Sequence, residues 1–125
     1  MAQKFILKSA AWLEIVVGIG LIVVPNLGSM LLFAAQLEGP GVPVARFAGI
    51  GLLSLGCACL ASNATGASRG AVLGLIVFNV AATILFVWVG LATTLHGLLL
   101  WPAAILHGAM AAGLAATRVR GVAAR

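Results

Sequence analysis

Four long apolar runs, separated by short turn segments, determine which folds this chain can adopt. The runs cover residues 5–24, 44–61, 70–91 and 98–116. A helix needs about 20 mostly apolar residues to cross the hydrocarbon core of a bilayer, and each run comes close to that length. We therefore predict an all-α fold, in which residues 1–125 form a single integral membrane domain built as a four-transmembrane-helix bundle.

The composition excludes an ordinary soluble protein. The chain is 63% hydrophobic and 7% charged, whereas globular chains are about 45–50% apolar and about 25% charged. A lipid bilayer is therefore the expected surrounding. The net charge of +5 does not indicate nucleic acid as a partner, because the basic residues lie at the ends of the apolar runs and form no basic face with interleaved aromatic residues.

The segment between the first two runs reads GSMLLFAAQLEGPGVP. The preceding Pro25 and Asn26 are helix-stop and turn signals that end the first helix. Ser29 can cap a short helix that extends to Leu37. Such a helix is too short to span a bilayer. We therefore predict a short interfacial helix at about 29–37, between helices 1 and 2.

The basic residues predict the orientation. Four spanning helices place the N-terminus, the loop after the second run and the C-terminus on one side. Six of the seven basic residues fall on that side: Lys4, Lys8, Arg69, Arg118, Arg120 and Arg125. Arg46 alone falls on the other. Cytoplasmic loops carry an excess of Lys and Arg, so both termini are predicted to be cytoplasmic.

Small residues at four-residue spacing predict close packing between helices. In bilayers, such residues admit the van der Waals contact that holds helices together. The sequence places ladders of this kind in the last three runs, and Gly18-x-Gly20 in the first run is a further packing feature. The ladders are Ala45 and Gly49; Gly66, Gly70 and Gly74; and Ala104, Gly108, Ala112 and Ala116.

Each apolar run has one polar side chain at or near its midpoint. These four residues are Glu14, Ser54, Asn79 and His107. Because they share one depth, we predict that they meet in the centre of the bundle. An acidic residue at the centre of a membrane helix costs about 2.5–3.5 kcal/mol on insertion scales, and that cost falls if the residue faces the interior and finds a donor.

Two interpretations of this polar layer stay open. In the first, Glu14, Asn79, His107 and Ser54 bind a ligand or handle a proton, as intramembrane ionisable groups usually do. In the second, they form a hydrogen-bonded clasp that fixes the register of the helices. We expect Glu14 and His107 to be neutral or to share one proton at neutral pH.

Arg46, at the outer end of the second run and near Glu38, is a fifth candidate. It either forms an ion pair or contacts a lipid headgroup, or it binds the anionic group of a ligand.

No motif for hydrolase or nucleotide chemistry is present, so we predict no catalytic residue, no cofactor and no metal site. Cys57 and Cys59 lie two positions apart on one predicted helix, so their side chains point away from each other and cannot form a disulfide. An enzyme is therefore the less favoured class, although the sequence does not decide the question.

The blocks WLEIVVGIGLIVVP, VARFAGIGLLSLGCACL, IVFNVAATILF and LLLWPAAILHG resemble a widespread family of small bacterial four-helix membrane proteins. More broadly, they are similar to the DoxX-like group, whose namesake is associated with a thiosulfate:quinone oxidoreductase. The resemblance implies a four-helix bundle in the bacterial cytoplasmic (inner) membrane and an accessory role beside a redox or transport complex. It supplies no catalytic residue to match.

Two functions are therefore predicted. The first is an accessory or small-ligand-binding subunit with a polar cluster at the midplane, partnered by a larger membrane complex or by further copies of itself. The alternative is an autonomous proton-coupled small-molecule transporter that uses Glu14. The strong bias in basic residues and the inserted interfacial helix argue against the four-helix exporters that work as antiparallel dimers.

Overall fold

The structure is a computed structural model that describes the backbone of residues 2–65 and 69–123 and the side chains of residues 4–62 and 69–116. Within these residues the chain is all α-helical, which confirms the predicted class. The helices are α1 (Ala2–Val23), α2 (Pro25–Phe33), α3 (Gly41–Thr65), α4 (Arg69–Ala92) and α5 (Leu100–Ala123).

Three of these helices contain segments long and apolar enough to cross a membrane, at Lys4–Val23, Gly41–Ser62 and Arg69–Ala92. A shorter apolar helical segment covers Leu100–Ala116. Many large apolar side chains on these helices are exposed, as expected for side chains that face lipid. Phe47, for example, is 78% exposed. The chain is thus an integral membrane protein.

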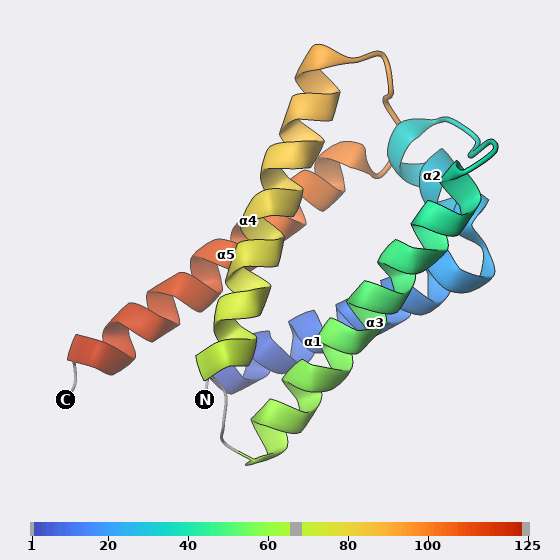
Figure 1. Cartoon of the computed structure of the whole chain (residues 1–125). Coiled ribbons are helices and arrows are strands. Elements are labelled where there is room, and N and C mark those ends of the chain that lie inside the picture. Colours follow the sequence, from blue (N-terminus) through green and yellow to red (C-terminus); the bar gives the residue numbers. More distant parts are fainter. Residues whose placement is uncertain (1, 66–68, 124–125) are drawn as a thin grey trace.

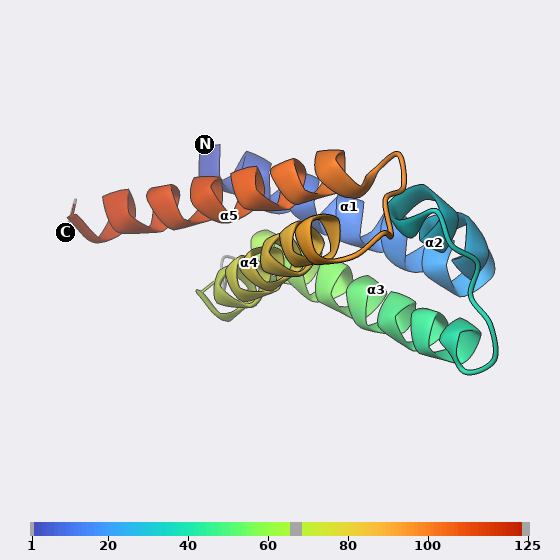
Figure 2. The ribbon, with the colours of Figure 1, turned by 90° about the horizontal axis from the view of Figure 1, so that it is seen from above.

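The long helices pack as α1 with α3 and α4 with α5, and the two pairs diverge toward one end of the molecule (Figures 1 and 2). Both termini lie at the other end, together with the end of α3 and the start of α4 (Figure 1). Lys4, Lys8 and Arg69 therefore share one end of the bundle. The side chains of Arg118 and Arg120, and all of Arg125, lie outside the described residues.

Backbone contact holds α1 against α3. A methyl group added at Gly18 would lie 2.7 Å from the Gly49 carbonyl oxygen, and one added at Gly56 would lie 2.6 Å from the Ala11 carbonyl oxygen. Only glycine allows this approach. The resulting van der Waals contact holds α1 against α3, because a bilayer supplies little hydrophobic driving force between helices. The predicted packing role is confirmed for Gly18 and Gly49, but Gly20 has nothing within 4 Å of an added methyl group.

The other predicted ladders contribute less. In α4, Gly70 has nothing within 4 Å of an added methyl group, whereas one at Gly74 would make ordinary contact with Leu55 at 3.7 Å. In α5, Ala104 is buried, and a methyl group at Gly108 would contact Thr83 at 3.6 Å. Gly66 lies outside the described residues.

Helix α2 begins earlier than predicted. It follows α1 after the single residue Val24 and starts at Pro25, so the predicted range of 29–37 is displaced by about one turn. Pro25 ends α1 as expected, but it also occupies the first turn of α2. Proline suits that position because its fixed φ matches a helix and no hydrogen bond there needs its missing N–H.

Ser29 lies inside α2 rather than at its start, and its hydroxyl donates to the Ala35 carbonyl oxygen at 2.7 Å beyond the helix end. Ala34 ends the helix in the left-handed conformation, with φ of 53°. The Leu37 N–H donates to Asn26 Oδ1 at 2.8 Å. These bonds fold residues 34–37 back onto α2, where the sequence suggested further helix.

The connection between α4 and α5 lies against the end of α2. The Gly97 N–H donates to the Leu32 carbonyl at 3.0 Å, and the Leu99 N–H donates to the Leu31 carbonyl at 2.8 Å. A side chain at position 97 would overlap the backbone of Leu31 and Leu32. Backbone hydrogen bonds therefore join the connection between α4 and α5 to the end of α2.

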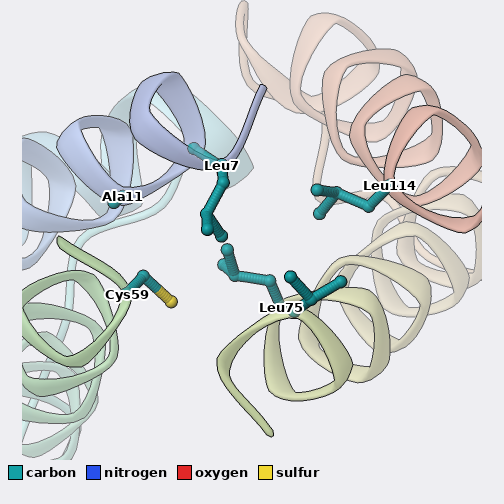
Figure 3. Packing of buried hydrophobic residues seen from close by; sticks show 7 residues of the cluster. Leu7, Ala11, Cys59, Leu75 and Leu114 are labelled. Atoms are coloured by element: carbon teal, nitrogen blue, oxygen red, sulfur yellow. The ribbon is translucent and has the colours of Figure 1, made fainter. Parts of the chain in front are cut away.

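A cluster of buried apolar residues lies toward the end that holds the termini. Leu7 and Ala11 from α1, Cys59 from α3, Leu75 from α4 and Leu114 from α5 point toward one another (Figure 3). All five are at most 2% exposed. Cys59 is a free thiol in this core, and Cys57 is exposed.

The contact between α1 and α3 can be tested with two glycines of α3. Gly49→Ala should lower the free energy of unfolding by about 1–3 kcal/mol, as overpacking does, because the added methyl group meets the Gly18 carbonyl. Gly51→Ala is the matched control, since nothing lies within 4 Å of a methyl group there. Unfolding in mixed micelles measures both variants, and an equal effect of the two would contradict the contact.

Candidate functional site

A cavity of about 420 Å³ lies between the two helix pairs and α2. Apart from Glu14 and His107, the described residues that line it are apolar. The lining comes from all five helices, from Val24 between α1 and α2, and from the connection before α5. The lining residues are Leu13, Glu14, Val17, Gly20, Leu21, Val24, Leu27, Gly28, Leu31, Leu32, Leu52, Phe78, Phe86, Leu99, Pro102, Ala103, Leu106 and His107.

Asn79 and His107 join α4 to α5 by a hydrogen bond. His107 Nδ1 lies 2.7 Å from Asn79 Oδ1, and Asn79 is completely buried. These two members of the predicted polar layer therefore meet as expected. Their bond matches the clasp interpretation, since it links side chains of neighbouring helices at one depth.

The Asn79 amide determines how His107 carries its proton. Asn79 Nδ2 donates to the Leu75 carbonyl oxygen one turn earlier, at 2.8 Å. The amide oxygen must then face His107 and accept from it, so the proton lies on Nδ1. A neutral imidazole with a proton on Nδ1 has its free electron pair on Nε2.

Two phenylalanines of α4 hold the His107 ring. The ring centroid of Phe78 lies 5.7 Å from that of His107, edge to face, and the centroid of Phe86 lies 5.6 Å from it. Sequence reasoning missed both residues. A signal was present for Phe86, which follows Asn79 by seven residues and therefore lies on the same face of α4.

Glu14 lies at the same cavity but makes none of these bonds. Its side chain is 1% exposed, and its Oε1 is buried without a hydrogen-bond partner in the part of the chain that the structure describes. No ion pair or hydrogen bond joins it to His107 within that part. The structure thus shows no bond through which the two groups would share a proton, and the prediction that they are neutral or share one proton stays a prediction.

Ser54 does not join the layer. It is exposed on α3, and its hydroxyl donates to the Ile50 carbonyl oxygen of the same helix at 2.8 Å. Ser54 lies on an exposed face of α3, and back-bonding to the preceding turn satisfies it without a partner helix. Arg46 is also exposed on α3 and lies outside the cavity lining.

The site therefore combines a large apolar surface with two polar groups of unequal status. His107 is fixed by Asn79 and by two aromatic rings, whereas the Glu14 carboxyl is buried with an unpaired oxygen. Among the described residues, no group of three His, Cys, Asp or Glu side chains could hold a metal ion. The arrangement suits binding of an apolar molecule with a polar group.

The bond between Asn79 and His107 should stabilise the fold modestly. The coupling energy between Asn79→Leu and His107→Leu should be about 0.6 kcal/mol, the average that double-mutant cycles give for side-chain hydrogen bonds between membrane helices. The second replacement should then cost less by this amount than it does alone. Ser54→Ala serves as the control, because Ser54 bonds only within its own helix. Additive effects of the two leucine variants would show that the bond contributes nothing to stability.

Glu14→Leu should have the opposite effect. Because the carboxyl has no partner among the described residues, its removal should raise the free energy of unfolding, by up to about 2.5–3.5 kcal/mol on the insertion scale. The same unfolding assay measures the change, with Glu14→Gln as the polar control of similar size. A marked loss of stability in Glu14→Leu would show that Glu14 belongs to a structural clasp.

Comparison with known protein families, with curated proteins and with solved structures finds no match to this chain. The resemblance to the DoxX-like group stays a prediction from the sequence.

Proposed function

We propose that this chain is a small membrane protein of four spanning helices that binds an apolar small molecule in the cavity between its helix pairs. In this proposal Leu100–Ala116 forms the fourth span, which at 17 residues meets the lower limit for crossing a bilayer. The basic residues Lys4, Lys8 and Arg69 then face the cytoplasm, with both termini, at a bacterial inner membrane.

The observation that carries the proposal is the unpaired Glu14 carboxyl at the cavity. Buried polar groups in folded proteins nearly always have hydrogen-bond partners, and leaving one unpaired costs about 1–3 kcal/mol. Glu14 Oε1 has no such partner among the described residues. A bound molecule that supplies the missing hydrogen bond accounts for a group that the rest of the fold leaves unpaired.

The form of the cavity supports the same conclusion. Its volume of about 420 Å³ lies within the range of about 300–1,000 Å³ that is usual for small-molecule sites. Such sites are mostly apolar, with a few polar groups that fix the orientation of the ligand. Glu14 and His107 provide those groups here.

The alternative, a proton-coupled transporter, would use the same carboxyl but also requires the cavity to open to each side of the membrane in turn. Binding requires access from one side only. An accessory role beside a larger membrane complex is compatible with binding, and the exposed apolar faces of the spans would then contact a partner or lipid.

Binding can be tested by photolabelling in lipid nanodiscs with an alkyl diazirine probe that ends in a hydroxyl group. We expect the adducts to map to cavity-lining residues. Ala103→Phe should reduce them strongly, because Ala103 lines the cavity. Ala109→Phe, an exposed position on the same helix, should leave them unchanged. Adducts spread equally over the outer faces in all three proteins would refute the site.

A further inference from the structure

We infer that the molecule held in the cavity is uncharged and carries a hydroxyl head group, as a long-chain alcohol or an alkylphenol does. This inference rests on the proposed function and names the chemical class of the ligand. It follows from the donors and acceptors that the two polar lining residues present.

His107 presents an acceptor. Asn79 accepts the Nδ1 proton, and the Asn79 amide is held in that orientation by the Leu75 carbonyl. The neutral ring therefore has its electron pair on Nε2. Nε2 makes no hydrogen bond within the described part of the chain, and the ring lines the cavity. A ligand must donate to this atom if it is to satisfy it.

Glu14 presents both a donor and an acceptor. Its side chain is 1% exposed, and no basic side chain forms an ion pair with it among the described residues. An isolated carboxylate in such surroundings is so costly that the group takes up a proton instead. The neutral carboxyl then offers one O–H donor and one carbonyl oxygen acceptor. Of its two oxygens, Oε1 is buried without a hydrogen-bond partner among the described residues.

A hydroxyl group matches this set, because it donates one hydrogen bond and accepts others. A hydrocarbon end would leave Glu14 and His107 unpaired. An ammonium group has only donors, so it has no atom that could accept a hydrogen bond from the Glu14 O–H. A carboxylate on the ligand would place an anion in an apolar cavity without a cation to pair with it. The remaining lining is apolar and suits an alkyl chain or a ring.

Nitrogen NMR of the histidine ring tests the first step directly. His96→Gln removes the other histidine, which is exposed in the connection before α5, so that only His107 reports. Without probe, one ring nitrogen should be protonated and the other should carry an electron pair. A hydroxyl-ended alkyl probe should shift the Nε2 signal. A probe with the same alkyl chain that ends in a methyl group should not. A proton on Nε2, or equal shifts with both probes, would overturn the inference.

Competition against the photolabel tests the head-group class, with all competitors at equal concentration in the lipid phase. The hydroxyl-ended competitor should act at least about tenfold more strongly than the methyl-ended or ammonium-ended ones, as hydrogen bonds of ordinary net strength imply. Glu14→Leu should remove most of this advantage, and Glu14→Gln, which keeps a donor and an acceptor, should rescue it. Helicity and elution volume confirm that the variants are folded.

The outcomes separate this inference from the function on which it rests. Equal competition by all three probes at the cavity would overturn the hydroxyl preference and leave the binding function standing. Preference for the ammonium probe, lost in Glu14→Gln, would show that Glu14 acts as a carboxylate and would also overturn it. No labelling of the cavity by any probe would overturn both.

Discussion

The close backbone contact between α1 and α3 is the constraint on which the other features of this fold depend. Lipid provides little apolar driving force between helices, so contact through glycine must hold the pair together. With Ala11 and Gly18 facing α3, the helical turn of about 100° per residue places Glu14 beside that face. The contact therefore directs the carboxyl toward the space between the helix pairs and away from lipid.

The polar groups at this depth divide into two kinds. Asn79 and His107 satisfy each other and join α4 to α5, as a structural clasp does. Glu14 adds nothing to that clasp and carries the cost of a buried, unpaired carboxyl oxygen. Hydrogen bonds between membrane helices average only about 0.6 kcal/mol, so even a bond to Glu14 would not have offset its burial. Stability therefore explains Asn79 but not Glu14.

The sequence was sufficient to predict the long helices, because apolar length and turn signals depend on local composition alone. It was also sufficient to predict the depth of Glu14, Asn79 and His107, since depth follows from position within an apolar run. It could not predict which face of a helix turns inward, and Ser54 failed for that reason. The face depends on packing between helices, and in α3 that packing is decided by Gly49 and Gly56.

The start of α2 was missed for a different reason. Proline ends one helix and can begin the next, and composition does not show which of these roles Pro25 has. Here it has both, so that the chain turns directly from α1 into α2. Residues 34–37 then fold back onto α2 through hydrogen bonds to the side chains of Ser29 and Asn26. The sequence indicated a role for Ser29 only as a helix cap.

The path of α2 also explains how the space between the helix pairs is bordered by α2 without being filled. Leu31 and Leu32 line the cavity with their side chains, while their carbonyl groups accept hydrogen bonds from Leu99 and Gly97. Backbone bonds thus help to hold α2 in place. At the other end lies the buried apolar core around Leu75. Glu14 and His107 lie between these two regions, where space is left for a ligand.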